Sequence, residues 1–252
     1  MIDKSDEYQI MHQVEEQLWW YQILHNKTLR AIKTNFSSMD IRILDAGCGT
    51  GGMLRFLQKN GYSNLQGIDL SDDAVRFTRA RGFEVQTLDL RKIATLDTSE
   101  RFDVIICNDV LCYFNDAEIG HILTNFRARL NPNGLIISNN NAYSCFEGVH
   151  SIVLNIPRRF VIEEFKIIFN NLSFELASYT YWSFILSPLI WLYRKLQLLA
   201  LKVRFVKIEN LASDVGYPGD FTNIFLLNIV KFEEKCFDKA PFGSSVFWVV
   251  RV

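Results

Sequence analysis

A group of glycines directly follows an acidic residue near position 45 and has the residue types of a ligand-binding turn. The segment reads DAGCGTGG over residues 45–52 and lies between a short apolar run and a stretch with helical periodicity. Glycines in such a turn allow a tight backbone path and a close approach to a bound molecule. The pattern D-x-G-x-G-x-G therefore predicts a nucleoside-binding turn where a strand passes into a helix.

The carboxylate of Asp45 distinguishes between two classes of ligand for this turn. A dinucleotide presents its pyrophosphate to the N-terminus of the following helix, and a neighbouring carboxylate would repel that anion. A ligand that carries an ammonium or a sulfonium group is attracted instead. The turn thus favours S-adenosylmethionine, and a nicotinamide-dependent oxidoreductase is the alternative that binding of reduced NAD would support.

Further polar residues follow the later apolar runs. Asp69 stands 22 positions after Gly47, where an acidic residue meets ribose hydroxyls in nucleotide-binding βαβ units. Asp89 ends the next run, in a position to accept from an adenine amino group, and Asn108 and Asp109 follow the run after it. The carboxyl ends of parallel strands meet at one edge of a sheet, where ligands bind beside the topological switch point. These residues are therefore expected to form one site.

Strands and helices must alternate to position these residues, and the hydrophobic pattern does alternate. The expected strands cover residues 41–45, 65–70, 83–88, 102–107, 135–138, 174–181 and 244–252. Stretches of helical periodicity separate the first five. This order predicts an α/β fold with a doubly wound, seven-stranded, mostly parallel sheet and a helical cap.

Four segments are expected within a single domain of 252 residues, a length that suits one α/β unit. Residues 1–38 would form an N-terminal helical lid, with one helix over about 5–35. The α/β core would cover residues 39–182. A helical insertion over residues 183–243 would cap the acceptor site, and residues 244–252 would add the final strand to the core sheet.

These segments resemble the successive motifs of the class I S-adenosylmethionine-dependent methyltransferases. The sequences ILDAGCGTGGMLRFL, GIDLS, LDL and FDVIICNDVL follow the order and spacing of that family over roughly residues 41–140. A looser resemblance links the chain to a bacterial small-molecule subgroup with a Trp-Trp-Tyr helix. It rests on EQLWWY at 16–21, NAY at 141–143, His150, RRF at 158–160 and PFG at 241–243. The resemblance implies a Rossmann-like fold.

The resemblance also implies which residues would contact S-adenosylmethionine. The methionine and ribose part would be held by Asp45, Gly47, Gly49 and Gly51, with Cys48 between them. Asp69, with Leu70 beside it, would bind the ribose hydroxyls. Asp89 and Leu90 would contact the adenine, and Asn108 would bind the methionyl amino group. Trp20 and Tyr21 are predicted to cover the donor, since an aromatic ring attracts a sulfonium. No metal site is expected.

Methyl transfer from a sulfonium depends mainly on proximity and alignment, and a base is needed only if the acceptor must lose a proton. The candidates for orienting or deprotonating an acceptor are His150, Tyr113 and Tyr143. The candidates for binding it are Arg158 and Arg159, which could clamp a carboxylate or phosphate, and Trp182. Their structural alternatives are a hydrogen-bonded loop histidine, aromatic pocket walls and surface ion pairs. Cys112-Tyr113 replaces the Glu-His common in relatives, so a family-typical base is not assumed.

The composition limits which binding partners and which cellular location are expected for the protein. The 27 basic and 28 acidic residues give a net charge of −1, which offers no basic footprint for nucleic acid. The 20 Phe, 9 Tyr and 5 Trp argue for an apolar acceptor pocket. The N-terminal residues lack the apolar core of a signal peptide. Five scattered cysteines without Cys-x-x-Cys spacing predict free thiols in a cytoplasmic protein.

The sequence predicts methyl transfer from S-adenosylmethionine to a small, fairly apolar acceptor such as a specialised metabolite, by a monomer or homodimer. Whether nitrogen, oxygen or carbon is methylated stays open. One alternative is an enzyme at a membrane surface that acts on a lipid or isoprenoid. It rests on the apolar residues over 182–192, which precede Arg194, Lys195, Lys202 and Arg204 as in an interfacial amphipathic segment. The other alternative is a non-catalytic binding subunit that retains the fold.

Overall fold

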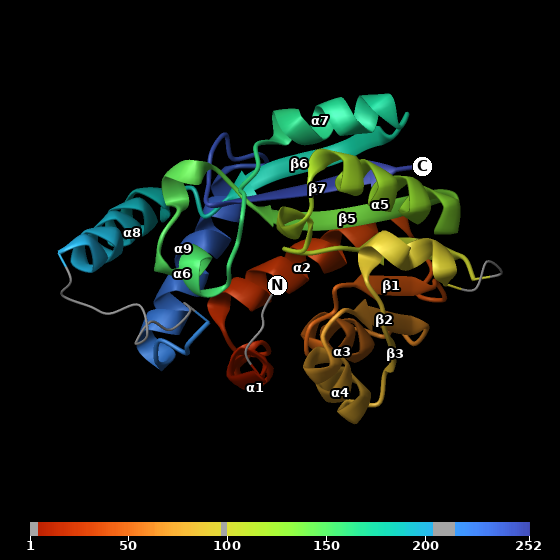
Figure 1. Ribbon diagram of the computed structural model, residues 1–252, viewed down its shortest axis with the longest axis horizontal. Coiled ribbons are helices and arrows are strands. Elements are labelled where there is room, and N and C mark those ends of the chain that lie inside the picture. The colour runs from red at the N-terminus through yellow and green to blue at the C-terminus, as the bar shows by residue number, and fades with distance from the viewer. Residues whose placement is uncertain (1–4, 97–99, 204–214) are drawn as a thin grey trace.

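A computed structural model describes residues 5–96, 100–203 and 215–252 of the chain. At its centre is a seven-stranded sheet in the order β3-β2-β1-β4-β5-β7-β6 (Figure 1). The strands are β1 (Ile43–Ala46), β2 (Leu65–Asp69), β3 (Glu84–Thr87), β4 (Phe102–Ile106), β5 (Leu130–Asn141), β6 (Glu175–Trp182) and β7 (Ser245–Arg251). The first five pair in parallel, and β7 runs antiparallel to both β5 and β6. The predicted doubly wound, mostly parallel sheet is thus confirmed.

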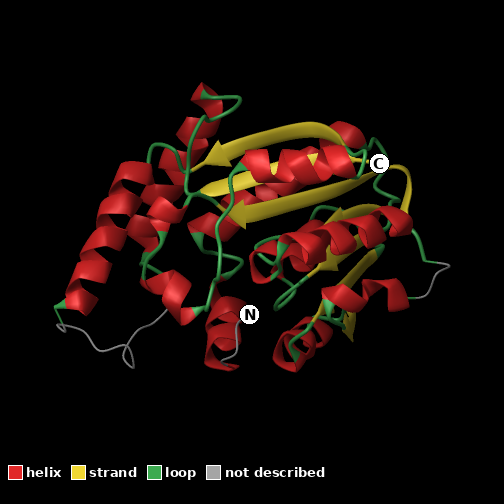
Figure 2. Cartoon of the chain, turned by 45° about the horizontal axis from the view of Figure 1, so that its top comes forward, coloured by secondary structure: helices red, strands yellow, loops and turns green. Residues whose placement is uncertain are grey.

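Helices cover both faces of the sheet (Figures 1 and 2). One face packs against α2 (Trp19–Asn35), α3 (Gly52–Lys59), α4 (Asp72–Ala80) and α9 (Asp220–Cys236). The other packs against α5 (Asp116–Arg129), α7 (Ile162–Asn171) and the 3-10 helix η1 (Leu90–Thr95). Within β4, Val104 and Ile106 face the first layer and Ile105 the second, and all three are fully buried. Side chains that alternate between two buried faces explain why these strands read as continuous apolar runs.

The N-terminal segment forms two helices rather than the single helix expected over 5–35. They are α1 (Ser5–Val14) and α2, and the chain turns between them so that Glu15 and Leu18 point inward and are buried. Helical periodicity continues across the turn, which is why the sequence did not indicate it. The break brings α1 beside α4, as Figure 1 shows.

The segment after β5 is more helical than expected. Strand β5 itself continues three residues beyond the predicted end, because Asn139, Asn140 and Asn141 pair with β7. It leads into the 3-10 helix η3 (Ser144–Phe146) and α6 (Val149–Val153), and α8 (Ser187–Lys202) packs against both. Within the described residues, no helix combines the length and apolar character needed to cross a bilayer. Arg204 and the predicted helix end near residue 206 lie outside the described residues.

Helix α9 supports the starts of two other helices. The Asn223 side-chain oxygen accepts from the backbone N–H of Trp19, 2.7 Å away, at the beginning of α2. Glu233 accepts from the backbone N–H of Ile185, 2.8 Å away, just before α8. Asn223 and Glu233 are both buried, so these bonds lie in the interior of the protein. Helix α9 therefore helps to position the starts of both α2 and α8.

Candidate active site

The glycine turn connects β1 to α3 and has the left-handed backbone that glycine accommodates. At Gly47 φ is 91°, and a Cβ added there would lie 2.3 Å from Cγ2 of Val110. The Gly47 N–H donates to the carbonyl of Ile68, 2.7 Å away, at the end of β2. The turn is thus fixed between the ends of β2 and β4, and a side chain at Gly47 would be both strained and overcrowded.

The two acids of the turn region lie together, as the sequence predicted. Asp69 accepts from the backbone N–H groups of Gly49 and Ser71, each at 2.9 Å, and burial raises the pKa of its carboxyl. Asp45 is buried, and this burial, reinforced by the charges of Asp69 and Glu15, raises its pKa to about 8. Buried carboxylates this close repel each other, so the site favours a cation between them.

Glu15 is a site residue that the sequence analysis missed. Its carboxylate accepts from Thr50 Oγ1 at 2.5 Å and from the Gly52 N–H at 3.1 Å, and it pairs with Arg81 at 2.6 Å. Burial is the main cause that raises its pKa to about 6. The carboxylate therefore occupies the N-terminus of α3, the place where a dinucleotide's pyrophosphate would bind. The sequence signal was weak, since one acid in a predicted N-terminal helix suggests only a solvated position.

Helix α1 covers the glycine turn, which the sequence also did not indicate. Tyr8 is buried and hydrogen-bonds to Ser71, and burial, followed by the charge of Asp69, raises its pKa. A Cβ added to Gly49 would lie 3.3 Å from Sδ of Met11. The N-terminal helix thus lies directly over the residues predicted to bind the ribose.

The end of β4 is tied to β5 by amide side chains. The Asn108 side-chain oxygen accepts from the backbone N–H of Asn139 at 2.8 Å. The Asp109 carboxylate accepts from the side-chain N–H of Asn139 at 2.9 Å and from that of Asn141 at 3.4 Å. Burial raises the pKa of Asp109 to about 7, although the Asn139 bond and the charge of Arg159 oppose this. Asn108 was predicted here, whereas the two asparagines of β5 were not.

The two aromatic residues Trp20 and Tyr21, at the start of α2, have different neighbours. Burial and neighbouring carboxylates, Asp109 among them, raise the pKa of Tyr21, so its ring lies beside the strand ends. Trp20 packs against Tyr21 at 5.1 Å and against Trp182 at 5.5 Å between ring centroids. Trp182 is fully buried and donates to the Asn139 side chain at 2.8 Å. Trp182 therefore lies in the core, between the end of β5 and Trp20.

The residues predicted for the adenine lie at the end of β3. Asp89 begins η1, accepting from the Arg91 backbone N–H at 2.9 Å, and it pairs with the Arg91 guanidinium at 2.6 Å, which lowers its pKa. Leu90 is buried in the core, whereas Leu70 is exposed. Asp89 thus stands at the expected edge, with its carboxylate already engaged by a cation.

Two tyrosines line the opposite side of the strand ends. Tyr113, in the 3-10 helix η2 (Leu111–Tyr113), donates to the carbonyl of Leu154 at 3.1 Å, and burial raises its pKa. Tyr143 packs between Tyr181 and Phe242, at centroid distances of 5.0 and 4.6 Å. A tyrosine with a raised pKa stays protonated, so Tyr113 can donate a hydrogen bond but is a poor base.

The other candidates for acceptor contacts lie on and after α6. His150 is half-buried in α6, which packs against α8. Arg158 pairs with Asp116 at 2.6 Å, the ion pair that the structural alternative anticipated. Arg159 donates to Ser151 Oγ at 2.9 Å, and burial lowers its pKa to about 10. Of the two arginines, Arg159 is therefore the one whose charge faces the interior.

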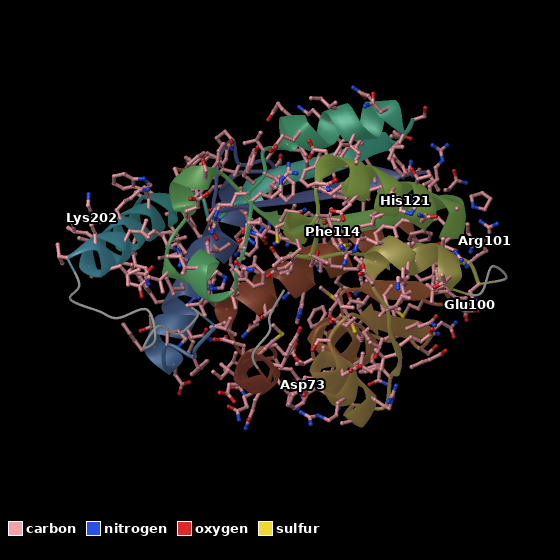
Figure 3. The ribbon with its side chains drawn as sticks, in the orientation of Figure 1. Asp73, Glu100, Arg101, Phe114, His121 and Lys202 are labelled. Carbon is pink, nitrogen blue, oxygen red and sulfur yellow. The ribbon has the colours of Figure 1, made fainter. Side chains whose placement is uncertain are left out.

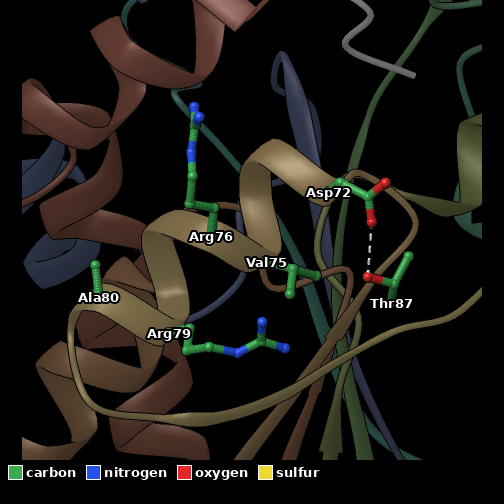
Figure 4. Close-up of a pocket in the computed structure, with 6 residues that line it drawn as sticks. All are labelled: Asp72, Val75, Arg76, Arg79, Ala80 and Thr87. Atoms are coloured by element: carbon green, nitrogen blue, oxygen red, sulfur yellow. Dashed lines mark hydrogen bonds between the residues drawn. The ribbon is translucent and has the colours of Figure 1, made fainter.

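A surface depression between α4 and β3 is separate from these residues (Figure 4). Its lining consists of Asp72, Val75, Arg76, Arg79, Ala80 and Thr87. Thr87 Oγ1 donates to the Asp72 carboxylate at 2.9 Å across it. The lining includes no residue of the glycine turn or of the β4 end, so this depression is distinct from the predicted donor site.

Comparison with characterised proteins points to one family. The chain is 26% identical over 140 residues to the ubiquinone biosynthesis O-methyltransferase of Rickettsia bellii, which covers 54% of each chain. It is 25% identical over 128 residues to the malonyl-[acyl-carrier protein] O-methyltransferase of Priestia megaterium, covering 50% of this chain and 46% of that one. The chain spans about half the length of the curated relatives it matches.

A solved structure and a family model extend the match. The structure of a SAM-dependent methyltransferase from Archaeoglobus fulgidus superposes with a TM-score of 0.57 and 13% identity, covering 92% of this chain and 94% of that one. At this identity the likeness establishes the fold. A family model described as a methyltransferase domain matches residues 15–196. The chain therefore belongs to the methyltransferase domain family and has the fold of the S-adenosylmethionine-dependent class I enzymes.

Proposed function

We propose that the protein transfers a methyl group from S-adenosylmethionine to a small, fairly apolar acceptor, such as a specialised metabolite. The observation that carries the proposal is the set of buried carboxylates around the glycine turn and the ends of β1, β2 and β4, namely Asp45, Asp69, Asp109 and Glu15. Burial is the main cause that raises the pKa of each, and the charges of Asp69 and Glu15 add to it at Asp45. A donor with a sulfonium and an ammonium group supplies the positive charge that such a site favours.

The hydrogen bonds of the site suggest which residue would hold each part of the donor. Asp69 would take the ribose hydroxyls, since the Gly49 and Ser71 N–H bonds already hold its carboxylate in place. Asn108 would meet the methionyl amino group, and Tyr21 would cover the donor from α2. The first 38 residues would act as the lid and residues 183–243 as the cap over the acceptor. Bound S-adenosylmethionine supplies an activated methyl group, and the chain's part is to align the acceptor with it.

The acceptor side is built mainly from aromatic and apolar groups. Tyr143 with its ring neighbours Tyr181 and Phe242 gives an apolar wall, and Tyr113 can orient an acceptor by accepting a hydrogen bond at its hydroxyl oxygen, because its O–H is donated to the Leu154 carbonyl. His150 is our candidate base, and Arg159 our candidate for a polar group on the acceptor. The named relatives act in ubiquinone biosynthesis and on malonyl-[acyl-carrier protein], both as O-methyltransferases. These names favour an oxygen nucleophile, which usually needs help to lose its proton.

Calorimetric titration with S-adenosylhomocysteine tests the donor half of the proposal. The wild-type chain is expected to bind, and Asp69→Asn is expected to weaken binding roughly tenfold or more, about 1.4 kcal/mol. Asp40→Asn is the matched control, because Asp40 is exposed and its carboxylate accepts from the Asn64 side chain at 2.8 Å. Absence of binding by the wild type would contradict the proposal and favour the alternative of a non-catalytic binding subunit that retains the fold.

A second candidate acceptor is a lipid or an isoprenoid. Two observations favour it: the apolar side chains of α8 point outward, and α8 packs against η3 and α6, which carries His150. Methyl transfer measured with acceptors dispersed in detergent against soluble acceptors separates the two. Faster turnover of the water-soluble compounds would favour the metabolite. The five free thiols support a cytoplasmic location, with the enzyme as a monomer or homodimer.

A further inference from the structure

Helix α8 is amphipathic, but its apolar stripe faces outward and is exposed. Leu189, Leu192, Leu196, Leu199 and Val203 recur every three or four residues and form one stripe. Each of these side chains is between 49% and 64% exposed. The buried member of the helix is Ser187. A stripe with this spacing normally packs on the core, so its outward position leaves a continuous apolar face without a partner in the described chain.

Helix α9 also has exposed apolar residues. Phe221, Ile224 and Phe225 lie within about one helical turn, Phe232 follows about two turns later, and all four are 55% to 85% exposed. The inward face of α9 is mixed: Leu227 and Val230 are buried together with Asn223 and Glu233, and Glu234 pairs with Lys27 at 2.7 Å. Both helices lie beyond the carboxyl end of β5, as Figure 1 shows. We call the nine outward apolar residues of the two helices the α8–α9 surface.

The charges beside the α8–α9 surface are mainly positive. The exposed charged side chains of the two helices, among the described residues, are Lys195, Lys202, Lys231, Lys235 and Asp220. Figure 3 shows Lys202 at the free end of α8. On the helix, Lys195 and Lys202 are displaced by about 80° and 100° from the centre of the leucine stripe, at about 100° per residue. Trp191 and Tyr193 are also exposed on α8. A chain with a net charge of −1 thus carries positive charge beside this apolar surface.

We propose that the α8–α9 surface rests on a lipid bilayer that contains anionic phospholipid. Leucine and phenylalanine side chains would enter the boundary between headgroups and acyl chains, the lysines would meet the phosphates, and Trp191 and Tyr193 would lie at headgroup level. A second copy of the chain fits less well, because it would bring lysines of one copy against those of the other. The proposal goes beyond the methyl-transfer function and holds for either class of acceptor.

Co-sedimentation of the full chain with vesicles tests the surface. Binding is expected to vesicles of phosphatidylcholine with phosphatidylglycerol, and several-fold weaker binding to phosphatidylcholine alone or at high salt. Leu196→Glu is expected to reduce the bound fraction roughly tenfold, since it places a charge inside the apolar stripe. Lys195→Glu combined with Lys202→Glu should remove the preference for the anionic vesicles.

Ile167→Glu is the matched control, because Ile167 is 64% exposed on α7, outside the α8–α9 surface, compared with 55% for Leu196. Circular dichroism and S-adenosylhomocysteine binding of the same samples check folding and the donor site separately. No vesicle binding by the wild type, or an equal loss in Ile167→Glu, would overturn the proposal. Light scattering that shows a dimer dissociated by Leu196→Glu, without vesicle binding, would assign the surface to a second copy instead.

Discussion

Two helices of similar apolar character, α3 and α8, bury their leucines in opposite ways. Leu54 and Leu57 of α3 are fully buried against the sheet beside the glycine turn. Leu192 and Leu196 of α8 are about half exposed, and Ser187 is the buried residue of that helix. The leucines of α3 thus stabilise the fold by packing on the sheet, whereas the leucine stripe of α8 makes no packing of this kind among the described residues.

The largest expected effect comes from Glu15→Ala in the donor half. It removes the buried acceptor of the Gly52 N–H and the Thr50 hydroxyl and leaves Arg81 with the half-exposed Glu16 as its carboxylate partner, and it should cost about 3–5 kcal/mol of unfolding free energy. Glu16→Ala is the control, because its pairs with Lys59 and Arg81 involve a half-exposed carboxylate and are worth less than about 1 kcal/mol. Urea denaturation measures both. Equal losses would mean that Glu15 does not anchor the lid.

A leucine-to-alanine pair compares the two helices directly. Leu54→Ala should cost about 2–5 kcal/mol, because it leaves a cavity in a fully packed core. Leu196→Ala should change the unfolding free energy by no more than about 0.5 kcal/mol, since that side chain is exposed. Denaturant midpoints in the absence of lipid provide the measurement. A cost above 1 kcal/mol for Leu196→Ala would show that α8 packs against something in the free protein.

Gly47→Ala tests the turn that positions the donor. The new Cβ would meet Val110 while φ is 91°, so strain and overpacking together should cost about 2–4 kcal/mol and abolish S-adenosylhomocysteine binding. Gly82→Ala is a control with nearly the same φ, 87°, and no atom within 4 Å of the new Cβ. It should cost about 1 kcal/mol and leave binding intact. Thermal unfolding with and without the ligand distinguishes them, and loss of binding in both variants would argue against the steric explanation.

The pH dependence of stability tests the buried carboxylates themselves. The folded-state pKa values of Glu15, Asp109 and Asp45 are raised to about 6, 7 and 8, above the unfolded values near 4. The folded state therefore binds more protons than the unfolded state between pH 4 and 8, and stability falls as the pH rises through that window. The midpoint of urea denaturation is expected to fall steadily from pH 6 to pH 8. S-adenosylhomocysteine should reduce this slope, and a slope of the opposite sign would contradict the buried carboxylates.

The sequence predicted the parts of the molecule that depend on local pattern. The glycine turn and the acids at strand ends could be found because each sits directly after an apolar run. Glu15 could not, since it reaches Thr50 only through the turn between α1 and α2, 35 positions away. Helical periodicity identified the stripe of α8 but not its direction, because spacing alone does not reveal which face meets the core. Trp182, predicted to contact the acceptor, is fully buried and donates to the Asn139 side chain, a position that its aromatic type alone does not indicate.

The two bonds of α9 have a mechanical consequence. Asn223 holds the first residue of the helix that carries Trp20 and Tyr21, and Glu233 holds the residue that introduces α8. The starts of α2 and α8 are therefore both attached to α9. Under the proposed function, in which α2 covers the donor, lifting of α2 for product release would either move α9 or break the Asn223 bond. Docking of the α8–α9 surface would restrain the same helix, so the time spent at a membrane and the rate of product release would be coupled.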